Sequence, residues 1–331
     1  MITPRLFRKS LRGALQWRLL LMWWVSLLVP GAVAALPVFT FLSRQLDHSP
    51  RAAQALPWMD GAMFLDLLRQ LGENGAEQSI GLGLAGAALM LLFISPFLAG
   101  ATVAAARSDE PLPLQNLLAG AGEFYGRMLR TFVAGLIPLG IGGGLAAGAM
   151  KLVEKANQHA VTETAAGRHL RVGLATAGAL VFVAHLLVDT ARAQFAADSS
   201  RRSALLALWS SVRLFLRRPL RAIGIGALGA AVGLGLAGAL MALRLQIAQA
   251  GPFTILIAWA LAQAAHLALG WGRATRIFGL AELARADGAD RDRAESFRME
   301  PPATSPPPAA PPEVQSATLA ALEPPPPPAA R

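Results

Sequence analysis

The chain contains no cysteine and a single tyrosine, and charged residues make up only 15% of its 331 residues. Ordinary soluble domains carry about 25% charged residues. The absence of cysteine excludes disulfide frameworks, thiolate metal sites and cysteine nucleophiles. The scarcity of charge, together with a hydrophobic content of 54%, favours a protein that lies in a membrane.

The sequence also lacks the motifs of the common catalytic chemistries. It contains no His-Glu-x-x-His, no Gly-x-Ser-x-Gly and no phosphate-binding loop that ends in Gly-Lys-Ser/Thr. Gly81, Gly83 and Gly86 match Gly-x-Gly-x-x-Gly, but they lie inside an apolar run, without the strand and turn of a dinucleotide site. We therefore predict no catalytic residue, no metal site and no cofactor, and a protein that is not an enzyme.

Long apolar runs dominate what is present, and a membrane-spanning helix needs about 20 such residues. The six runs lie near Trp17–Leu42, Ile80–Ala106, Met128–Met150, Val172–Ala197, Leu220–Leu243 and Phe253–Trp271. They predict an all-α polytopic membrane protein with six transmembrane helices in residues 1–285. We expect the first run to be a retained helix rather than a cleaved signal peptide, because its apolar character continues to Leu42.

The net charge of +10 predicts the orientation of these helices. If the N-terminus is cytoplasmic, most Lys and Arg residues fall in cytoplasmic segments, which is the positive-inside bias. Both termini are then expected to be cytoplasmic. Nucleic acid is not an expected partner, because the arginines flank membrane spans instead of forming a basic face on a folded domain.

Short amphipathic stretches with basic residues precede the first, third and fifth runs, which predicts three two-helix units. The stretches begin at Ile2, Leu114 and Ser203, with apolar residues at helical spacing. We interpret them as interfacial helices in the cytoplasmic leaflet; the alternative is ordinary helix ends with basic anchors. The arginines expected to contact anionic lipid head groups are Arg127, Arg130, Arg213, Arg217 and Arg218.

Residues 286–331 are predicted to form a disordered cytoplasmic tail. The segment is charged at first and Pro-rich from about Ser296, ending in Pro324–Pro328. This composition cannot form a packed core. Pro-rich segments can recruit a partner protein, although a plain tail is the more common outcome.

Glycines at intervals of four residues predict close helix packing in the third and fifth runs. Small residues at this spacing let helix backbones approach each other in a membrane. The residues concerned are Gly140, Gly144, Gly148, Gly229 and Gly233.

Ionisable and polar residues interrupt the fourth and sixth runs, where burial in lipid is costly. They are His185, Asp189, Arg192, Gln263 and His266. One hypothesis is a polar cluster that lines a pathway or a proton relay. We favour a structural role, because Asp189 and Arg192 lie near the membrane boundary and a neutral histidine needs only one neighbouring carbonyl.

Three local patterns resemble a known group of proteins. They are Phe97-Leu98-Ala99-Gly100 with the later Gly126-Arg127-Met128-Leu129-Arg130, then Asp189-Thr190-Ala191-Arg192, then Leu214-Phe215-Leu216-Arg217-Arg218-Pro219. Together they look like uncharacterised bacterial six-helix membrane proteins, similar in layout to the membrane domain fused to some glycerophosphodiester phosphodiesterases. The resemblance spans roughly residues 1–285 and implies a layout only, because the soluble phosphodiesterase domain has no counterpart in this sequence.

These observations predict a non-enzymatic inner-membrane protein that serves as a scaffold or accessory factor in envelope or lipid processes. Its expected partners are anionic membrane lipids at the cytoplasmic face and a protein recruited by the tail. The alternative is a small transporter or lipid-handling permease, with a path lined by the fourth and sixth helices. A water-accessible cavity beside His185 or His266 would favour the transporter, and a filled bundle would favour the scaffold.

Overall fold

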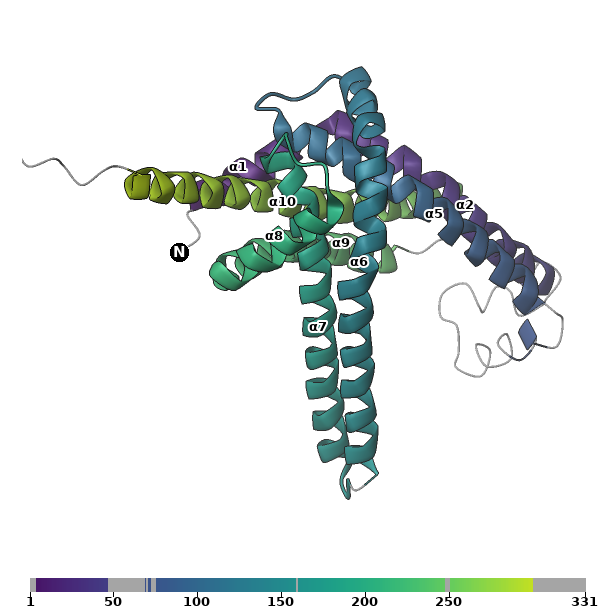
Figure 1. The fold of residues 1–331 in the computed structure, drawn as a ribbon. Coiled ribbons are helices and arrows are strands. Elements are labelled where there is room, and N and C mark those ends of the chain that lie inside the picture. Colours follow the sequence, from purple (N-terminus) through teal and green to yellow (C-terminus); the bar gives the residue numbers. More distant parts are fainter. Residues whose placement is uncertain are drawn as a thin grey trace, which may run out of the picture. The chain divides into compact units, whose positions relative to one another are not determined.

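The structure is a computed structural model that describes residues 4–46, 69, 71–72, 76–158, 160–247 and 251–299. Within these ranges the fold is all-α, as predicted (Figure 1). The helices are α1 (Pro4–Ala14), α2 (Trp17–Leu46), α5 (Ala76–Arg107), α6 (Leu114–Asn157), α7 (Glu163–Ala197), α8 (Ala204–Arg217), α9 (Pro219–Leu245) and α10 (Pro252–Met299).

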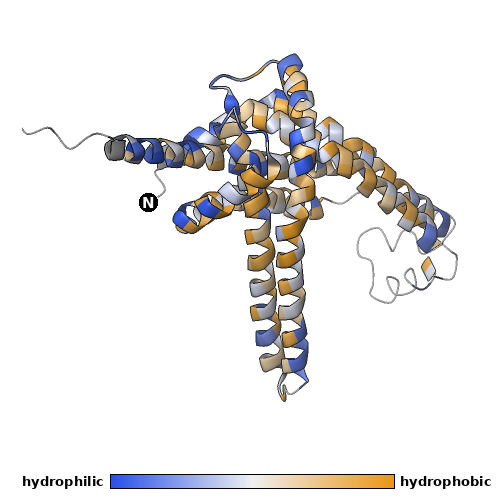
Figure 2. Ribbon diagram, in the orientation of Figure 1, coloured by the Kyte–Doolittle hydropathy of each residue, from blue (hydrophilic) through white to orange (hydrophobic). Residues whose placement is uncertain are grey.

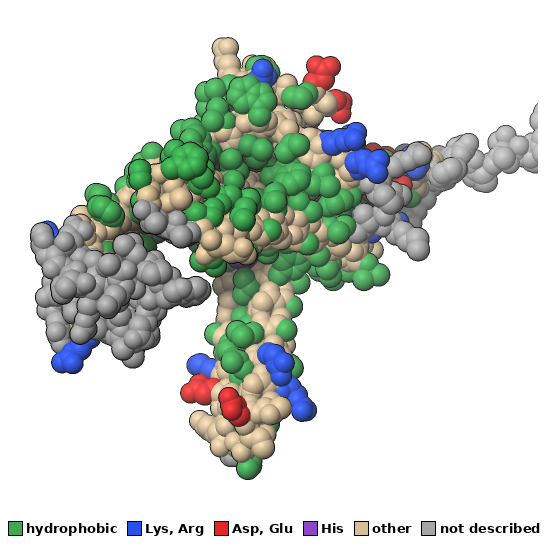
Figure 3. Space-filling view, turned by 180° about the vertical axis from the view of Figure 1, so that it is seen from behind, with side chains coloured by type: hydrophobic (Ala, Val, Ile, Leu, Met, Phe, Trp, Pro, Cys, Tyr) green, Lys and Arg blue, Asp and Glu red, His purple; other side chains and the backbone are tan. Residues whose placement is uncertain are grey.

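Six of these helices are long and apolar enough to cross a membrane, namely α2, α5, α6, α7, α9 and α10. They contain the six apolar runs, and their hydrophobic residues extend along much of their length (Figure 2). On the face drawn in Figure 3, hydrophobic side chains cover most of the described surface and charged side chains form a few clusters. The predicted six apolar helices are therefore confirmed.

Two predicted boundaries differ from the structure. The amphipathic stretch at Leu114 is continuous with α6, whose 44 residues extend over about 66 Å at a rise of 1.5 Å per residue. By contrast, α1 and α8 are separate helices. The segment 286–299, predicted to be disordered, continues α10 as helix, where Asp290 and Arg293 form an ion pair one turn apart at 3.5 Å. Residues 300–331 of the predicted tail lie outside the described residues.

The chain divides into a compact unit, Met1–Asp287, and a second unit, Gly288–Arg331. In the first unit, the buried residues of α5 and α7 gather at one end of each helix. In α5 they fall mainly in Pro96–Ala106, and in α7 mainly in Ala184–Ala196, whereas the opposite halves of both helices are largely exposed. The core therefore lies at the helix ends that the charge pattern assigns to the cytoplasmic side.

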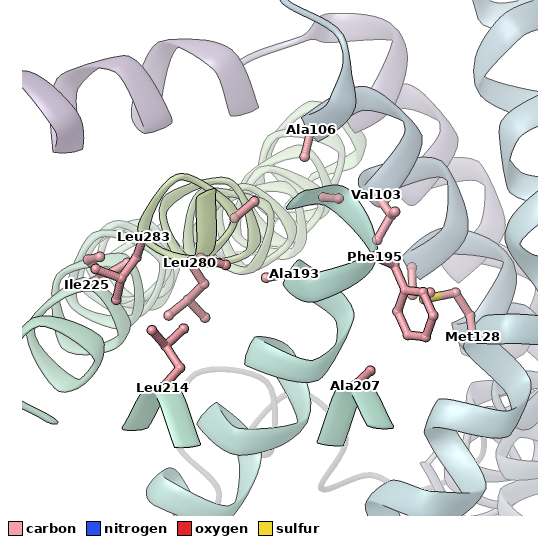
Figure 4. Packing of buried hydrophobic residues seen from close by; sticks show 14 of the residues in the cluster. Val103, Ala106, Met128, Ala193, Phe195, Ala207, Leu214, Ile225, Leu280 and Leu283 are labelled. Carbon is pink, nitrogen blue, oxygen red and sulfur yellow. The ribbon is translucent and has the colours of Figure 1, made fainter. Parts of the chain in front are cut away.

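The main core joins six helices at this end, namely α5, α6, α7, α8, α9 and α10. Phe195 of α7 lies beside Met128 of α6, and Leu280 of α10 lies near Leu214 of α8 (Figure 4). The α9 residue Ile225 belongs to the same buried cluster. Because most of the remaining cluster members are alanines, the helix backbones can pack closely.

Helices α9 and α10 are in close backbone contact through glycines. A Cβ atom added at Gly272 would lie 2.7 Å from both the carbonyl oxygen of Gly229 and the Cα of Gly233. Gly229 and Gly233 thus lie at a helix–helix contact. The other three predicted packing residues do not: nothing lies within 4 Å of a Cβ atom built at Gly140, Gly144 or Gly148.

The α6–α7 contact uses different glycines. A Cβ atom at Gly142 would meet the Cβ of Ala184 and the carbonyl oxygen of Leu180, and one at Gly135 would meet Val188. These two glycines are buried, whereas Gly140, Gly144 and Gly148 are exposed. The spacing of four residues therefore identified a row of small residues on α6, but a neighbouring row makes the contact.

Replacing Gly272 by alanine should destabilise the packed unit, because the new methyl group would collide with backbone atoms that cannot rotate away. We expect a loss of about 1–3 kcal/mol in the free energy of unfolding, measured by thermal unfolding in detergent. The matched control is Gly144→Ala, which adds its methyl group in open space and should be neutral or slightly stabilising. Equal melting temperatures for the two variants would contradict the α9–α10 contact.

Candidate functional site

A buried charged group lies on α7, namely Asp189, which is 4% exposed. Its Oδ1 lies 3.0 Å from Nη1 of Arg192 and 4.0 Å from Nε of Arg273, and its Oδ2 lies 3.2 Å from Nη2 of Arg276. We call these four residues the Asp189 cluster. One carboxylate thus faces three guanidinium groups, one from its own helix and two from α10.

The four residues of the Asp189 cluster come as two pairs, one on α7 and one on α10, and helix geometry places the members of each pair side by side. Arg192 follows Asp189 by three residues on α7, and Arg276 follows Arg273 by three residues on α10, so each pair shares one helix face. Gly229 of α9 makes room for the stem of Arg276, since a Cβ atom there would collide with the Cγ of this arginine. The glycine contact between α9 and α10 and the charged cluster therefore depend on each other.

Arg273 extends the cluster to two further helices. Its guanidinium lies over the ring of Trp23 of α2, 5.6 Å from the ring centroid. The indole Nε1 of Trp23 donates to Oγ1 of Thr102 on α5 at 3.3 Å, and this hydroxyl donates to the carbonyl oxygen of Leu98 at 2.8 Å. Helices α2, α5, α7 and α10 are thereby connected through one set of polar contacts.

The Asp189 cluster is suited to holding α7 and α10 together through ion pairs, and we call this role a clamp. The ion-pair partners of the Asp189 carboxylate are arginines, and a guanidinium keeps its proton in proteins. The Nε atoms of Arg192 and Arg276 are buried without a hydrogen-bond partner. An arginine-only environment holds a charge in place, but it offers no group that exchanges a proton with Asp189.

The five residues of the predicted polar cluster are separated in the structure. Asp189 and Arg192 belong to the Asp189 cluster. His185 is exposed, with its Nδ1 3.0 Å from the carbonyl oxygen of Val181. Gln263 and His266 line a different cavity of about 430 Å³ between α2 and α10. His185 thus has a backbone partner of its own, and the carboxylate of Asp189 contacts arginines instead.

The cavity beside His266 is mainly aromatic and aliphatic. Trp23, Trp24 and Trp259 contribute to its wall. The Oε1 of Gln263 accepts a hydrogen bond from the indole Nε1 of Trp24 at 3.0 Å, and Nδ1 of His266 lies 2.8 Å from the carbonyl oxygen of Ala262. Both polar residues on α10 thus have local partners.

Sequence reasoning missed Arg273 and Arg276, although they complete the cluster. Both directly follow the sixth apolar run, which ends at Trp271. Their position makes them look like ordinary basic residues of the segment after a membrane span. Their spacing of three residues matches that of Asp189 and Arg192. This match is the signal that could have paired the two helices.

Further polar contacts of α10 fasten the other helix ends. Nη2 of Arg285 donates to the carbonyl oxygens of Ala106 and Ala196 at 2.7 and 3.1 Å, in the last turns of α5 and α7. A cation there compensates the negative ends of two helix dipoles. Asp287, 4% exposed, pairs with Nε of Arg218 at 3.2 Å and with Nη1 of Arg217 at 4.0 Å.

The arginines predicted to contact lipid head groups have varied surroundings. Arg217 and Arg218 pair with Asp287. Arg127 lies over Phe124 at 5.2 Å, and Arg213 lies over Trp209 at 5.3 Å. Arg130 is exposed. Stacking and ion pairing therefore hold four of the five in fixed positions, and contact with lipid stays a prediction.

Comparisons with family models, curated proteins and solved structures found no match to this chain. The resemblance to the membrane domain of some glycerophosphodiester phosphodiesterases therefore stays a prediction. Among the residues that the structure describes, no group of three or more His, Asp and Glu side chains is placed to hold a metal ion.

Replacing Asp189 by asparagine should destabilise the protein strongly, because three guanidinium groups would lose their buried counter-charge. We expect a loss of about 3–5 kcal/mol in the free energy of unfolding, measured by thermal or denaturant unfolding in detergent. Variants Arg273→Gln and Arg276→Gln should each lose less, because they leave Asp189 with its other partners.

The matched control is Asp198→Asn, which also removes a carboxylate from an Asp–Arg pair three residues apart. Asp198 is 41% exposed at its side chain and lies 3.5 Å from Arg201. The Ser200 hydroxyl donates to this carboxylate and lowers its pKa, so that the control removes a charge as well. An exposed pair contributes about 1 kcal/mol or less, so equal losses in the two variants would contradict the clamp.

Proposed function

We propose that the chain is a non-enzymatic integral protein of the bacterial inner membrane, which serves as a scaffold or accessory factor in envelope or lipid processes. The observation that carries this proposal is the Asp189 cluster. Its charges face one another across α7 and α10 and fasten these helices. A path along the fourth and sixth helices would instead need such charges to face a cavity.

The proposed orientation places both termini in the cytoplasm. The end of the bundle that contains the Asp189 cluster then lies at the cytoplasmic face, and α1, α8 and the first turns of α6 lie along the head groups as three basic elements. Helices α2 and α5, α6 and α7, and α9 and α10 form the three proposed two-helix units. Anionic lipids are the proposed partners of the basic residues.

One observation favours the alternative of a small transporter or lipid-handling permease. The cavity of about 430 Å³ beside His266 lies within a candidate membrane span. However, it lies between α2 and α10 rather than between α7 and α10, and its wall is dominated by tryptophan and leucine side chains. It therefore supports an apolar contact more than a polar path, and the scaffold remains the preferred proposal.

Single cysteines can test the orientation, because the native chain has none. Val161, between α6 and α7, is 97% exposed, and Ser199, between α7 and α8, is exposed as well. In intact spheroplasts, a membrane-impermeant maleimide should label Val161→Cys and should label Ser199→Cys only after lysis. The reverse pattern would overturn the orientation, and the cysteine-free chain provides the background.

The scaffold proposal can be tested by removing the Pro-rich tail after Met299, which leaves the described helices intact. Affinity purification of the full chain and of residues 1–299 should give partner sets that differ by at least one protein. A full-length variant with Pro324–Pro328 replaced by serine tests whether the prolines carry the recruitment. Identical partner sets for all three proteins would remove the tail as a recruiting element.

A further inference from the structure

A second cavity, of about 520 Å³, lies at the packed end of the first unit and is lined by basic residues. Its wall is formed by α1, by the segment after α5 and by α10. Four cations line it, namely Arg8, Lys9, Arg12 and Arg285, against two carboxylates, Asp109 and Glu282. The cavity is therefore electropositive.

Two of these cations are already engaged. Nζ of Lys9 lies 2.8 Å from Oε1 of Glu282, and Nη1 of Arg285 lies 3.3 Å from the same oxygen. Arg285 also donates to the last carbonyl groups of α5 and α7. Glu282 thus joins α1 to the point where these two helices end.

The other two cations, Arg8 and Arg12, are exposed and have no side-chain ion pair or hydrogen bond among the described residues. They lie four residues apart on α1, so their like charges repel each other on one helix face. A bound anion would relieve this repulsion. Paired guanidinium groups suit phosphate, which can accept two hydrogen bonds from each planar fork.

One exposed apolar side chain lies on the wall of the cavity and a second follows it closely in the sequence, which suits an amphiphilic ligand. Leu15 lies on the wall and is 58% exposed, and Trp17, where α2 begins, is 67% exposed. An acyl chain beside a phosphate group would cover these side chains, whereas a free phosphate ion would leave them in contact with water. Exposed tryptophan at the start of an apolar span is typical of the head-group level of a bilayer.

We propose that this cavity binds the phosphate group of an anionic glycerophospholipid of the phosphatidylglycerol type. Arg8 and Arg12 bind the phosphate, and Leu15 contacts the adjoining acyl chain. The site is distinct from the arginines of α6 and α8 discussed above. It rests on the proposed function in one respect, namely that the chain lies in a membrane with anionic lipids.

Binding at this site should stabilise the packed end, because Glu282 and Arg285 link the cavity wall to α5 and α7. The test uses the purified full chain in a neutral detergent and measures its melting temperature against added dioleoyl-phosphatidylglycerol. We expect a saturable rise with this lipid and a much smaller one with dioleoyl-phosphatidylcholine. Glycerol 3-phosphate and inorganic phosphate serve as soluble ligands for comparison. At the same concentrations they should not raise the melting temperature.

The double variant Arg8→Gln, Arg12→Gln should bind phosphatidylglycerol at least about tenfold more weakly. Its melting temperature without lipid should be no lower than that of the native chain, because neither side chain has an ion pair or hydrogen bond to lose and their mutual repulsion is removed. The matched control is Arg168→Gln, Arg171→Gln, which removes the same charge at the far end of α7 and should leave the lipid response unchanged. The variant Arg8→Lys, Arg12→Lys, which keeps the charges, should retain part of the response.

Three results would overturn the proposal. Native lipid affinity in the Arg8→Gln, Arg12→Gln variant would remove these arginines from the site, and an equal loss in the control would reduce the effect to general charge attraction. A full response to inorganic phosphate would identify the ligand as a soluble ion. None of these results bears on the scaffold proposal, which the orientation and tail experiments test separately.

Discussion

The arrangement of the packed end depends on the burial of one carboxylate. Asp189 is the counter-charge of three guanidinium groups, and removing an ionised group from water is costly unless its partners are fixed around it. Arg273 and Arg276 therefore hold α10 against α7. Through Arg273 the same constraint reaches Trp23 on α2 and Thr102 on α5.

A charged clamp suits a chain in which the hydrophobic effect cannot join the helices. In lipid, an apolar side chain gains little by leaving the bilayer for another helix, so close backbone contact and polar bonds provide the attraction. The core is built accordingly from alanines, from glycines such as Gly233 and Gly272, and from arginine contacts. The other halves of the helices expose residues such as Leu145 and Leu236, which are 56% and 43% exposed, and these surfaces suit lipid.

Local features of the sequence could be predicted, and features that depend on how helices cross could not. The six apolar helices follow from run length, and the Asp189–Arg192 pair follows from a spacing of three residues. The partnership with Arg273 and Arg276 requires knowledge that α10 lies beside α7. Spacing alone also could not decide which row of small residues on α6 makes the contact, and it selected the exposed Gly144 instead of the buried Gly142.

The charges at the packed end divide into two groups with different physical roles. Paired cations fasten helices: Arg276 binds Asp189, Arg218 binds Asp287, and Arg285 caps two helix ends. Replacing one of them would leave a buried carboxylate or a helix-end carbonyl group with fewer partners. Arg8 and Arg12, by contrast, contribute no pair to the fold and repel each other. Two cations that the fold leaves unpaired and that repel each other are explained best by a ligand outside the chain, and the exposed Leu15 on the same wall makes a phospholipid the ligand that satisfies both features.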